Sequence, residues 1–242
     1  MMRTEAKLWR IFLFSSVAVA FAIFFAAVPN TDITVSALFG DANGFPLSSS
    51  PFLNGVRSVM YMLTDWVMAL ALLMLVLGLL PGFPRIFTAR FLSFAVTSYI
   101  VGPGLIVNGI LKTYSGRVRP RDIDIFGGND AFFPVFDFAG QCQSNCSFVS
   151  GEASALATVA TILLIAVVPH LPKSNRIIAQ VTILTVAVAG SLLRVAFGAH
   201  FLSDVVFAWL ISFAVVAVLS RIFRIEQLAS PVTQIARPSN LA

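Results

Sequence analysis

The stretch that decides the fold of this chain reads FLSFAVTSYIVGPGLIVNGIL, residues 91–111, and it contains no charged residue. A run of about 20 predominantly apolar residues is long enough for a helix to cross the hydrocarbon core of a bilayer. The run ends directly at Lys112, where the chain becomes basic and polar. We therefore interpret residues 91–111 as a transmembrane helix that ends at a membrane surface.

Five further apolar runs lie along the chain, at Leu8–Val28, Ser58–Leu80, Ala153–Val168, Ile177–Leu193 and Leu202–Leu219. The composition agrees with this count, since 58% of the 242 residues are hydrophobic and only 11% are charged, against about 25% charged in soluble domains. The sequence predicts an all-α integral membrane bundle of six transmembrane helices, forming one domain over residues 1–225. We expect the polar tail, residues 226–242, to be a disordered cytoplasmic segment. The first run could instead be a signal peptide, but it is longer than the usual apolar part of one.

The lysines and arginines divide unequally between the two predicted sides of the membrane. If the N-terminus is cytoplasmic, ten of the sixteen lie on the inner side and six on the outer side. The excess of cations in cytoplasmic loops favours this orientation, with both termini inside. Because the cations punctuate apolar runs and do not gather on one helix face, the net charge of +5 indicates membrane topology and no nucleic-acid partner.

The six outer cations oppose the topological preference and need their own explanation. They are Arg57, Lys112, Arg117, Arg119, Arg121 and Arg194, and four of them lie in the single loop that begins at Lys112. In one interpretation, aspartates of the same loop neutralise them locally; these are Asp122, Asp124, Asp130 and Asp137. In the other, the cations bind an anion.

Three polar segments fall on this outer side: Lys112–Pro120, Phe148–Glu152 and Arg194–Asp204. Arginine holds phosphate oxygens with two parallel hydrogen bonds, and lysine acts as a point charge. Ser150 and Gly151 immediately precede a predicted helix, and the N-terminus of a helix attracts anions. Together these residue types predict a phosphate-binding cage.

His200 and Asp204 add a reactive group to the cage. They are four residues apart, so one helical turn would bring the carboxylate to the imidazole. A carboxylate on one ring nitrogen sets the tautomer and leaves the other nitrogen free to attack. The sequence therefore predicts an oriented nucleophile beside a bound phosphate.

In order and spacing, the three segments resemble the signatures of the type-2 phosphatidic acid phosphatase (PAP2) superfamily. The first is Lys112, six residues, and then Arg119-Pro120; the third contains Arg194, five residues, His200, three residues, and Asp204. The second signature, Pro-Ser-Gly-His, is represented by the stretch Val149–Glu152.

This resemblance implies an integral membrane phosphatase without a metal or other cofactor. By matching positions, Lys112, Arg119 and Arg194 would bind the phosphate oxygens, and Ser150 with the Gly151 amide would add hydrogen bonds. His200 would form a phosphohistidine, and Asp204 would orient it.

Three positions depart from the family pattern. Leu193 replaces a serine of the third signature, and in the second signature Val149 replaces proline and Glu152 replaces the histidine that serves as general acid. Glu152 could be a tuned acid, because environment adjusts carboxyl groups to that role elsewhere. Alternatively, protonation could matter less because the leaving group is already good, as in a diphosphate, or the chain could bind lipid phosphate without hydrolysing it.

Three residues outside the signatures stand out. Cys142 and Cys146 share the outer loop, and in an oxidising compartment they could form a disulfide. Asp65 lies inside the second apolar run, where a carboxylate is usually functional or paired. We expect it to support a cation of the site or to cap a hydrated pocket.

The resemblance implies hydrolysis of a phosphate monoester or diphosphate on a membrane lipid, at the periplasmic face of a bacterial inner membrane. Lipid A phosphatases are the family members that the chain resembles most, by its short length and basic loop. Undecaprenyl diphosphate and phosphatidylglycerophosphate phosphatases are the alternatives within the family. The rival from another class is a non-catalytic lipid-phosphate binder or a transporter, although a transporter would be expected to show internal repeats or broken helices.

Overall fold

The computed structural model describes residues 2–137, 140–228 and 231, and within them the regular structure is helical apart from two isolated β-bridges. The α-helices are α1 (Met2–Ala27), α2 (Asn30–Ser36), α3 (Pro51–Leu77), α4 (Ala89–Tyr99), α5 (Lys112–Tyr114), α6 (Gly151–Ile162), α7 (Lys173–Ala196) and α8 (Leu202–Ile222). Two π-helical segments, Ile100–Leu111 and Leu163–Val167, extend α4 and α6. Short 3-10 turns lie at Pro46–Ser49, Pro120–Asp122, Asp124–Phe126, Val168–His170 and Ile225–Gln227.

Each of the six predicted spans coincides with one of these helices. Five are long and apolar enough to cross a membrane: Pro51–Leu77, Ala89–Tyr114, Gly151–His170, Lys173–Ala196 and Leu202–Ile222. A sixth is formed if Phe12–Ala27 of α1 and α2, which are bent by 85° at Pro29, count as one span. The prediction of an all-α, multi-pass membrane bundle is confirmed, and the orientation of the termini stays a prediction.

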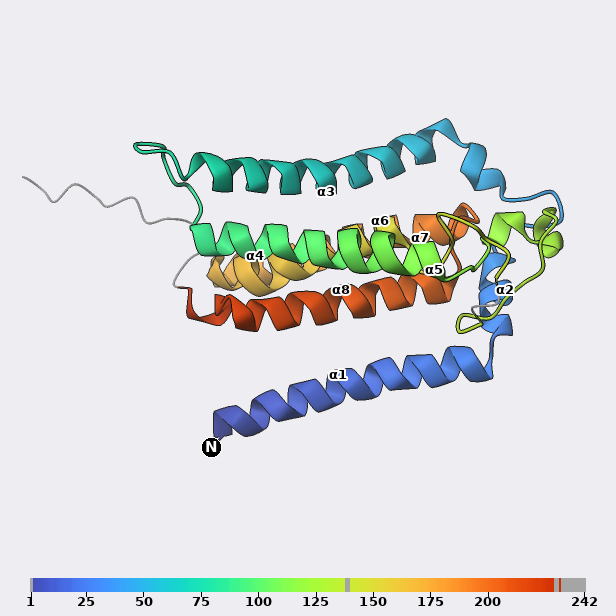
Figure 1. The fold of residues 1–242 in the computed structure, drawn as a ribbon, viewed down its shortest axis with the longest axis horizontal. Coiled ribbons are helices and arrows are strands. Elements are labelled where there is room, and N and C mark those ends of the chain that lie inside the picture. Colours follow the sequence, from blue (N-terminus) through green and yellow to red (C-terminus); the bar gives the residue numbers. More distant parts are fainter. Residues whose placement is uncertain (1, 138–139, 229–230, 232–242) are drawn as a thin grey trace, which may run out of the picture.

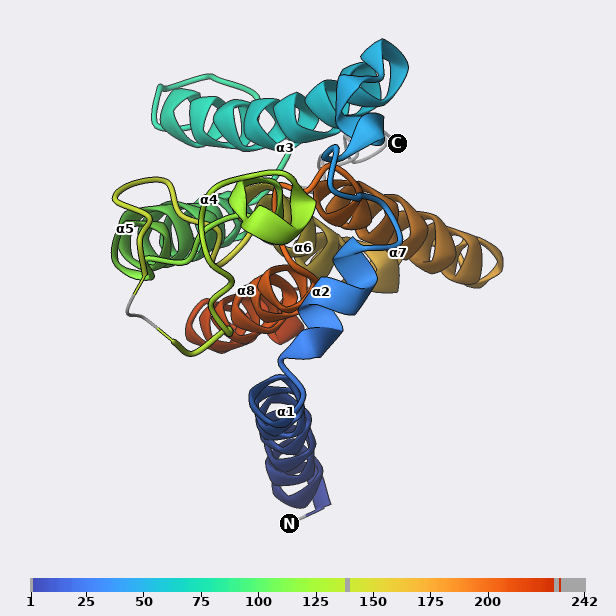
Figure 2. The same cartoon turned by 90° about the vertical axis from the view of Figure 1, so that its right-hand side faces the viewer.

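The helices run side by side, with their connecting segments gathered at the two ends (Figure 1). One end carries α2, α5 and the long connection between α5 and α6, and it is the end from which α6 and α8 begin. In the end-on view, α6 lies among α4, α7 and α8, whereas α1 stands apart from the bundle (Figure 2). The C-terminal end of α1 nevertheless packs on α8, where the Phe25 and Phe207 ring centroids are 6.1 Å apart.

Small residues allow α6 to occupy the centre. Ala153, Ala157 and Ala160 on this helix are buried, and small side chains allow neighbouring helix backbones to approach closely. The hydroxyl groups of Ser154 on α6 and Ser212 on α8 lie 2.8 Å apart. The start of α6 is therefore held firmly against α8, which positions Ser150 and Gly151.

The π-helical segment before Lys112 follows from a proline. Pro103 lacks the amide that a regular helix needs and crowds the preceding turn, and such local irregularities are common causes of π-helical turns and kinks. The Asn108 side chain donates to the Pro103 carbonyl oxygen at 2.8 Å, which satisfies one of the backbone groups of this segment. Asn108 also lies beside α6, because a Cβ atom on Gly151 would come 2.7 Å from its Oδ1.

The predicted tail, residues 226–242, falls mostly outside the described residues. Its beginning contributes to the 3-10 turn Ile225–Gln227, and the Pro231 carbonyl oxygen accepts a hydrogen bond of 2.9 Å from the Thr88 amide. The division into a domain and a disordered tail stays a prediction.

Candidate active site

The three polar segments predicted from the sequence meet at one end of the bundle. Lys112–Pro120 follows the π-helical segment, residues 142–150 lead into α6, and Arg194–Asp204 joins α7 to α8. Backbone hydrogen bonds tie them together: the Ser147 amide donates to the Arg117 carbonyl oxygen at 2.7 Å, and the Ser150 amide donates to the Asp204 carbonyl oxygen at 3.3 Å. Residues almost a hundred positions apart therefore share one site.

His200 lies buried at the centre of the site, with 1% of its surface exposed. Its Nδ1 lies 2.7 Å from the Ser147 carbonyl oxygen. Because a carbonyl oxygen can only accept, we assign the proton to Nδ1, which leaves the lone pair on Nε2. The ring is therefore in the tautomer that a nucleophilic Nε2 requires.

The environment keeps this ring neutral. Burial lowers the pKa of His200 to about 4, and although the Asp204 carboxylate opposes this effect, the cations of Arg194 and Lys112 add to it. Since an uncharged imidazole is needed for attack, the site holds His200 in its reactive form at neutral pH.

Asp204 contacts the ring less directly than its spacing predicts. Its Oδ2 lies 3.8 Å from His200 Nδ1, beyond hydrogen-bond distance, and Ser147 occupies the position of direct partner. Asp204 Oδ2 accepts instead from the Ser147 hydroxyl at 2.5 Å and the Phe201 amide at 2.9 Å. Its carboxylate thus fixes the segment that orients the imidazole.

Lys112 and Arg119 converge on one residue, Asn145. Lys112 Nζ donates to the Asn145 side-chain oxygen at 3.0 Å, and Arg119 Nη2 donates to the Asn145 carbonyl oxygen at 2.8 Å. Among the described residues, no carboxylate comes within ion-pair distance of either cation. Burial and the nearby cation of Arg121 lower the pKa of Arg119, and Asp122 opposes this shift, as expected for a buried cation beside a like charge.

The segment that carries Asn145 is closed by the two cysteines. Cys142 and Cys146 are joined, with Cα atoms 5.7 Å apart. The Cys146 amide donates to the Lys112 carbonyl oxygen at 3.1 Å, and the Cys142 amide donates to the Gly116 carbonyl oxygen at 3.0 Å. This small loop lies directly on the basic segment and presents Asn145 to its cations.

Arg194 and Ser150 complete the predicted cage. Arg194 is 7% exposed, and its Nε has no hydrogen-bond partner among the described residues. A buried guanidinium N–H without a partner is costly unless a ligand satisfies it. Ser150 is the N-cap of α6, since its hydroxyl oxygen accepts from the Ala153 amide at 3.3 Å; its hydroxyl proton remains available for an anion at the helix N-terminus.

Glu152 is held by two arginines. Arg57 Nε lies 2.9 Å from Glu152 Oε2, Arg57 Nη2 contacts Oε1, and Arg194 Nη1 lies 3.4 Å from Oε2. Arg57 comes from α3, 95 residues away from Glu152. The sequence singled out Arg57 only as one of the six outer cations, and nothing in its neighbours indicated this partner.

Two further expectations concern Asp65 and the aspartates of the basic loop. Asp65 receives a hydrogen bond from the Tyr99 hydroxyl, and among the described residues no cation lies within ion-pair distance of it. Local neutralisation of the basic loop extends to Arg121, whose Nε lies 3.7 Å from Asp122. Arg117, by contrast, pairs with carboxylates from other parts of the chain, Asp32 and Asp204.

The described residues contain no cluster of three or more His, Cys, Asp or Glu side chains that could hold a metal ion.

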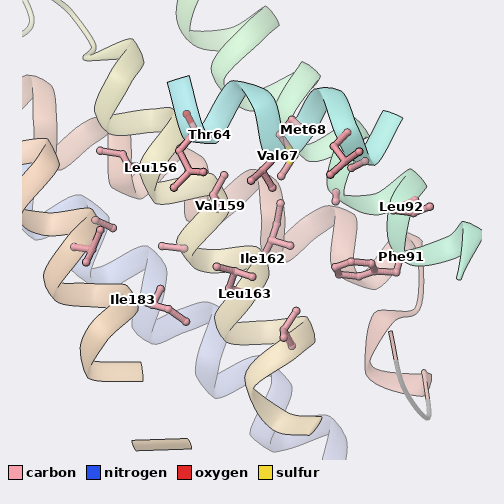
Figure 3. A pocket seen from close by; sticks show the side chains of 18 of the residues that line it. Thr64, Val67, Met68, Phe91, Leu92, Leu156, Val159, Ile162, Leu163 and Ile183 are labelled. Atoms are coloured by element: carbon pink, nitrogen blue, oxygen red, sulfur yellow. The ribbon is translucent and has the colours of Figure 1, made fainter. Parts of the chain in front are cut away.

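An apolar cavity of about 600 Å³ lies beside this site, between α3, α4, α6 and α7. Val67 and Met68 of α3, Val159 and Ile162 of α6 and Ile183 of α7 line it (Figure 3). Its lining includes Met60 and Leu156, which lie one helical turn from Arg57 and Glu152. The cavity therefore starts directly beside the polar site and continues into the membrane-crossing part of the bundle.

A neutral buried imidazole and a ring of cations at one end of a bundle of membrane-crossing helices, with an apolar cavity that runs from beside them into the bundle, define a membrane phosphatase that acts on lipids. The sequence profile of the PAP2 superfamily matches residues 88–227, and the chain belongs to this family. It is a PAP2-type lipid phosphatase, as the sequence predicted.

The chain is similar to three lipid A 4'-phosphatases. It is 33% identical over 219 residues to the protein of Rhizobium leguminosarum, with 84% of this chain and 91% of that protein covered. It is 30% identical over 193 residues to the protein of Francisella tularensis subsp. novicida, with 76% and 82% covered.

The fold is similar to a solved transmembrane PAP2-type phosphatidylglycerolphosphate phosphatase from Bacillus subtilis. The TM-score is 0.55, the sequence identity is 21%, and 89% of this chain and 98% of that chain are covered. At this identity the likeness concerns the fold.

Proposed function

We propose that this phosphatase removes a phosphate group from lipid A at the periplasmic face of a bacterial inner membrane, through a phosphohistidine on His200. The observation that carries the proposal is the neutral, buried His200 with its proton on Nδ1, near Lys112 and Arg119, for which the described part of the chain offers no carboxylate within ion-pair distance. The names of the similar proteins support lipid A as the substrate.

In the first step, Nε2 of His200 attacks phosphorus as the bond to the lipid oxygen breaks. Lys112, Arg119 and Arg194 hold the phosphate oxygens, whose negative charge is spread in the transition state. The Ser150 hydroxyl and the Gly151 amide, at the start of α6, add hydrogen bonds to the same oxygens. Water then attacks the phosphohistidine, which releases inorganic phosphate and restores His200.

Glu152 is our candidate for the general acid. Without substrate it is an ionised partner of Arg57 and Arg194, as the two ion pairs indicate. A phosphate that binds Arg194 would loosen one pair and place a second anion beside Glu152, which favours its protonated form. The carboxyl group could then protonate the leaving oxygen, which a sugar alkoxide requires more than a diphosphate does.

The apolar cavity supports a lipid over a soluble phosphate ester. It extends along α3 from Met60 to Met74, a distance of about 21 Å at 1.5 Å per residue. One leaflet of hydrocarbon is about 15 Å thick, so a complete acyl chain fits alongside the helix. The phosphate would then remain at the Arg57–Glu152 end.

A phosphate-release assay tests the proposal. Wild type and His200→Ala are purified in detergent and given bis-phosphorylated lipid A, undecaprenyl diphosphate and phosphatidylglycerophosphate in separate reactions. We expect release by wild type that is fastest on lipid A, and none by His200→Ala. The matched control is His170→Ala, at the opposite end of the bundle and exposed, which should retain full activity.

Each part of the proposal can fail separately. Equal release by wild type and His200→Ala would remove the nucleophile assignment. Faster release from undecaprenyl diphosphate or phosphatidylglycerophosphate would replace lipid A as the substrate. Binding of lipid A without release from any of the three would favour the lipid-phosphate binder.

A further inference from the structure

A buried charged cluster outside the phosphate cage is built around Arg117. Its side chain is 1% exposed, and its guanidinium group bridges two carboxylates. Nη2 lies 2.7 Å from Asp32 Oδ2, and Nη1 lies 2.5 Å from Asp204 Oδ1. One face of the guanidinium also lies 4.4 Å from the Phe201 ring centroid.

The guanidinium is almost fully occupied by these partners. Nη1 also donates to the Ser203 hydroxyl at 2.8 Å, and Nε donates to the Phe133 carbonyl oxygen at 3.2 Å. A buried arginine bound in this way has no free pair of donors for a phosphate, and releasing one would leave a buried carboxylate unpaired. Arg117 is therefore unlike Arg119 and Arg194, although it lies in the first signature segment.

Asp32 enters the cluster from α2, between the first and second apolar helices. It is 1% exposed; its Oδ1 accepts from the Ser203 amide at 2.9 Å and its Oδ2 from the Ser203 hydroxyl at 2.5 Å. These bonds attach α2 to the start of α8, one residue before Asp204. A segment 168 residues upstream of His200 in the chain thus reaches the back of the site.

The charges of the cluster matter for the chemistry. Two carboxylates share one guanidinium, so the cluster has a formal charge of −1. Asp32 compensates Arg117, and the charge of Asp204 then acts on the ring 3.8 Å away. When Nε2 bonds to phosphorus while Nδ1 keeps its proton, the ring becomes positive, and a nearby negative charge in a buried site stabilises it.

We propose that Arg117 and Asp32 are positioning residues: Arg117 holds Asp204 beside His200, and Asp32 neutralises Arg117 so that Asp204 stabilises the phosphorylated ring. The inference rests on the proposed function, because it requires His200 to be the nucleophile. It goes beyond the cage residues, since neither Arg117 nor Asp32 touches the substrate.

Two nearly isosteric substitutions separate the charge from the shape. Asp32→Asn removes one charge and keeps most of the volume. Arg117→Lys keeps the charge and loses the fork that binds two carboxylates. We expect each to lower kcat by about 10- to 100-fold, by analogy with the range seen when the hydrogen-bond partners of metal-bound imidazoles are removed. KM should stay within about threefold, since the phosphate cage is intact.

The experiment measures kcat and KM for phosphate release from bis-phosphorylated lipid A in mixed micelles. Rapid acid-free quenching with ³²P-labelled substrate also measures the rate at which the phosphoenzyme forms. This rate should fall together with kcat. The matched controls are Asp41→Asn and Arg121→Lys, exposed residues of the same outer region, which should match wild type. Thermal melting of each variant reports how much protein is folded; if Arg117→Lys does not fold, Asp32→Asn carries the test.

The outcomes distinguish this inference from the proposed function. If wild type releases phosphate and His200→Ala does not, but Asp32→Asn and Arg117→Lys keep kcat within about twofold, the inference alone is overturned. A loss that appears only as a raised KM, or as unfolded protein in both variants, overturns it too, because the cluster is then purely structural. If His200→Ala remains active, both proposals fail together.

Discussion

Glu152→Gln is the substitution that most directly tests the leaving-group side of the site. Glutamine has the same shape as glutamate, so its side-chain oxygen can still accept a hydrogen bond from Arg57. It cannot carry a negative charge or deliver a carboxylic proton. The change therefore removes the proposed acid while leaving the packing at the start of α6 in place.

The expected size of the effect follows from the contacts. The Arg57 and Glu152 side chains are 33% and 14% exposed, so the pair lies between surface ion pairs, worth about 0–1 kcal/mol, and buried ones, where removal of one partner costs about 3–5 kcal/mol. We expect a stability loss of about 1–2 kcal/mol. Loss of a general acid lowers kcat by about 10²- to 10⁴-fold on a substrate whose leaving oxygen needs a proton.

The assay compares a monoester and a diphosphate. Phosphate release is measured for wild type and Glu152→Gln on bis-phosphorylated lipid A and on undecaprenyl diphosphate, with Glu226→Gln as the matched control at the other end of the chain. We expect a far larger loss on lipid A, because the diphosphate leaving group departs without a proton. An equal loss on both substrates would refute the reasoning and leave Glu152 as an electrostatic partner of its two arginines.

Three further predictions concern the surroundings of the site. The pKa of His200 is about 4 in the folded protein because of its burial, against about 6.5 in an unfolded chain. The contribution of His200 to the free energy of unfolding is therefore fully present above pH 6.5 and is lost as the pH falls toward 4. Melting curves should show this decline, and it should be weaker in His200→Asn. The double variant Cys142→Ser/Cys146→Ser should raise KM for lipid A several-fold, because Asn145 in the loop between the cysteines contacts Lys112 and Arg119, the two cations proposed to bind phosphate. A reductant should raise the KM of wild type in the same way and leave the KM of the variant unchanged. A KM that is unchanged in both cases would contradict the prediction. Gly151→Ala places a Cβ atom 2.7 Å from Asn108 Oδ1 and should lower the free energy of unfolding by about 1–3 kcal/mol, as overpacking does. Adding Asn108→Ala to the same chain should recover part of this loss. A Gly151→Ala protein that melts like wild type would contradict the predicted clash.

Much of the fold could be predicted because a bilayer accepts few structures. Backbone groups in hydrocarbon must be satisfied within one segment, so an apolar run of sufficient length becomes a helix whatever its neighbours are. This is why Leu202–Leu219 and the run at residues 91–111 coincide with observed helices. The 85° bend between α1 and α2 was outside that reasoning, since an apolar run predicts only where a span begins and ends.

The cage residues could be recognised for a related reason. Lys112 and Arg119, or His200 and Asp204, are close in sequence, and their spacing in a local segment is itself part of the signature. In the predicted orientation the cations also oppose the topological preference, which made them candidates for a functional role. The spacing of four residues predicted a direct contact between Asp204 and the imidazole of His200. In the structure the carbonyl oxygen of Ser147, 53 residues away from His200, makes that hydrogen bond instead.

By itself, then, the sequence determined the helical membrane class and the family and pointed to candidate phosphate-binding residues, because each of these depends on composition or on short-range spacing. Only the tertiary structure decided which charges neutralise one another: Arg57 with Glu152, and Arg117 with both Asp32 and Asp204. These pairs join helices that are distant in the chain, and no local pattern specifies them. Their physical basis is burial, since a charge removed from water must find its partner wherever the packing of the helices brings one within reach.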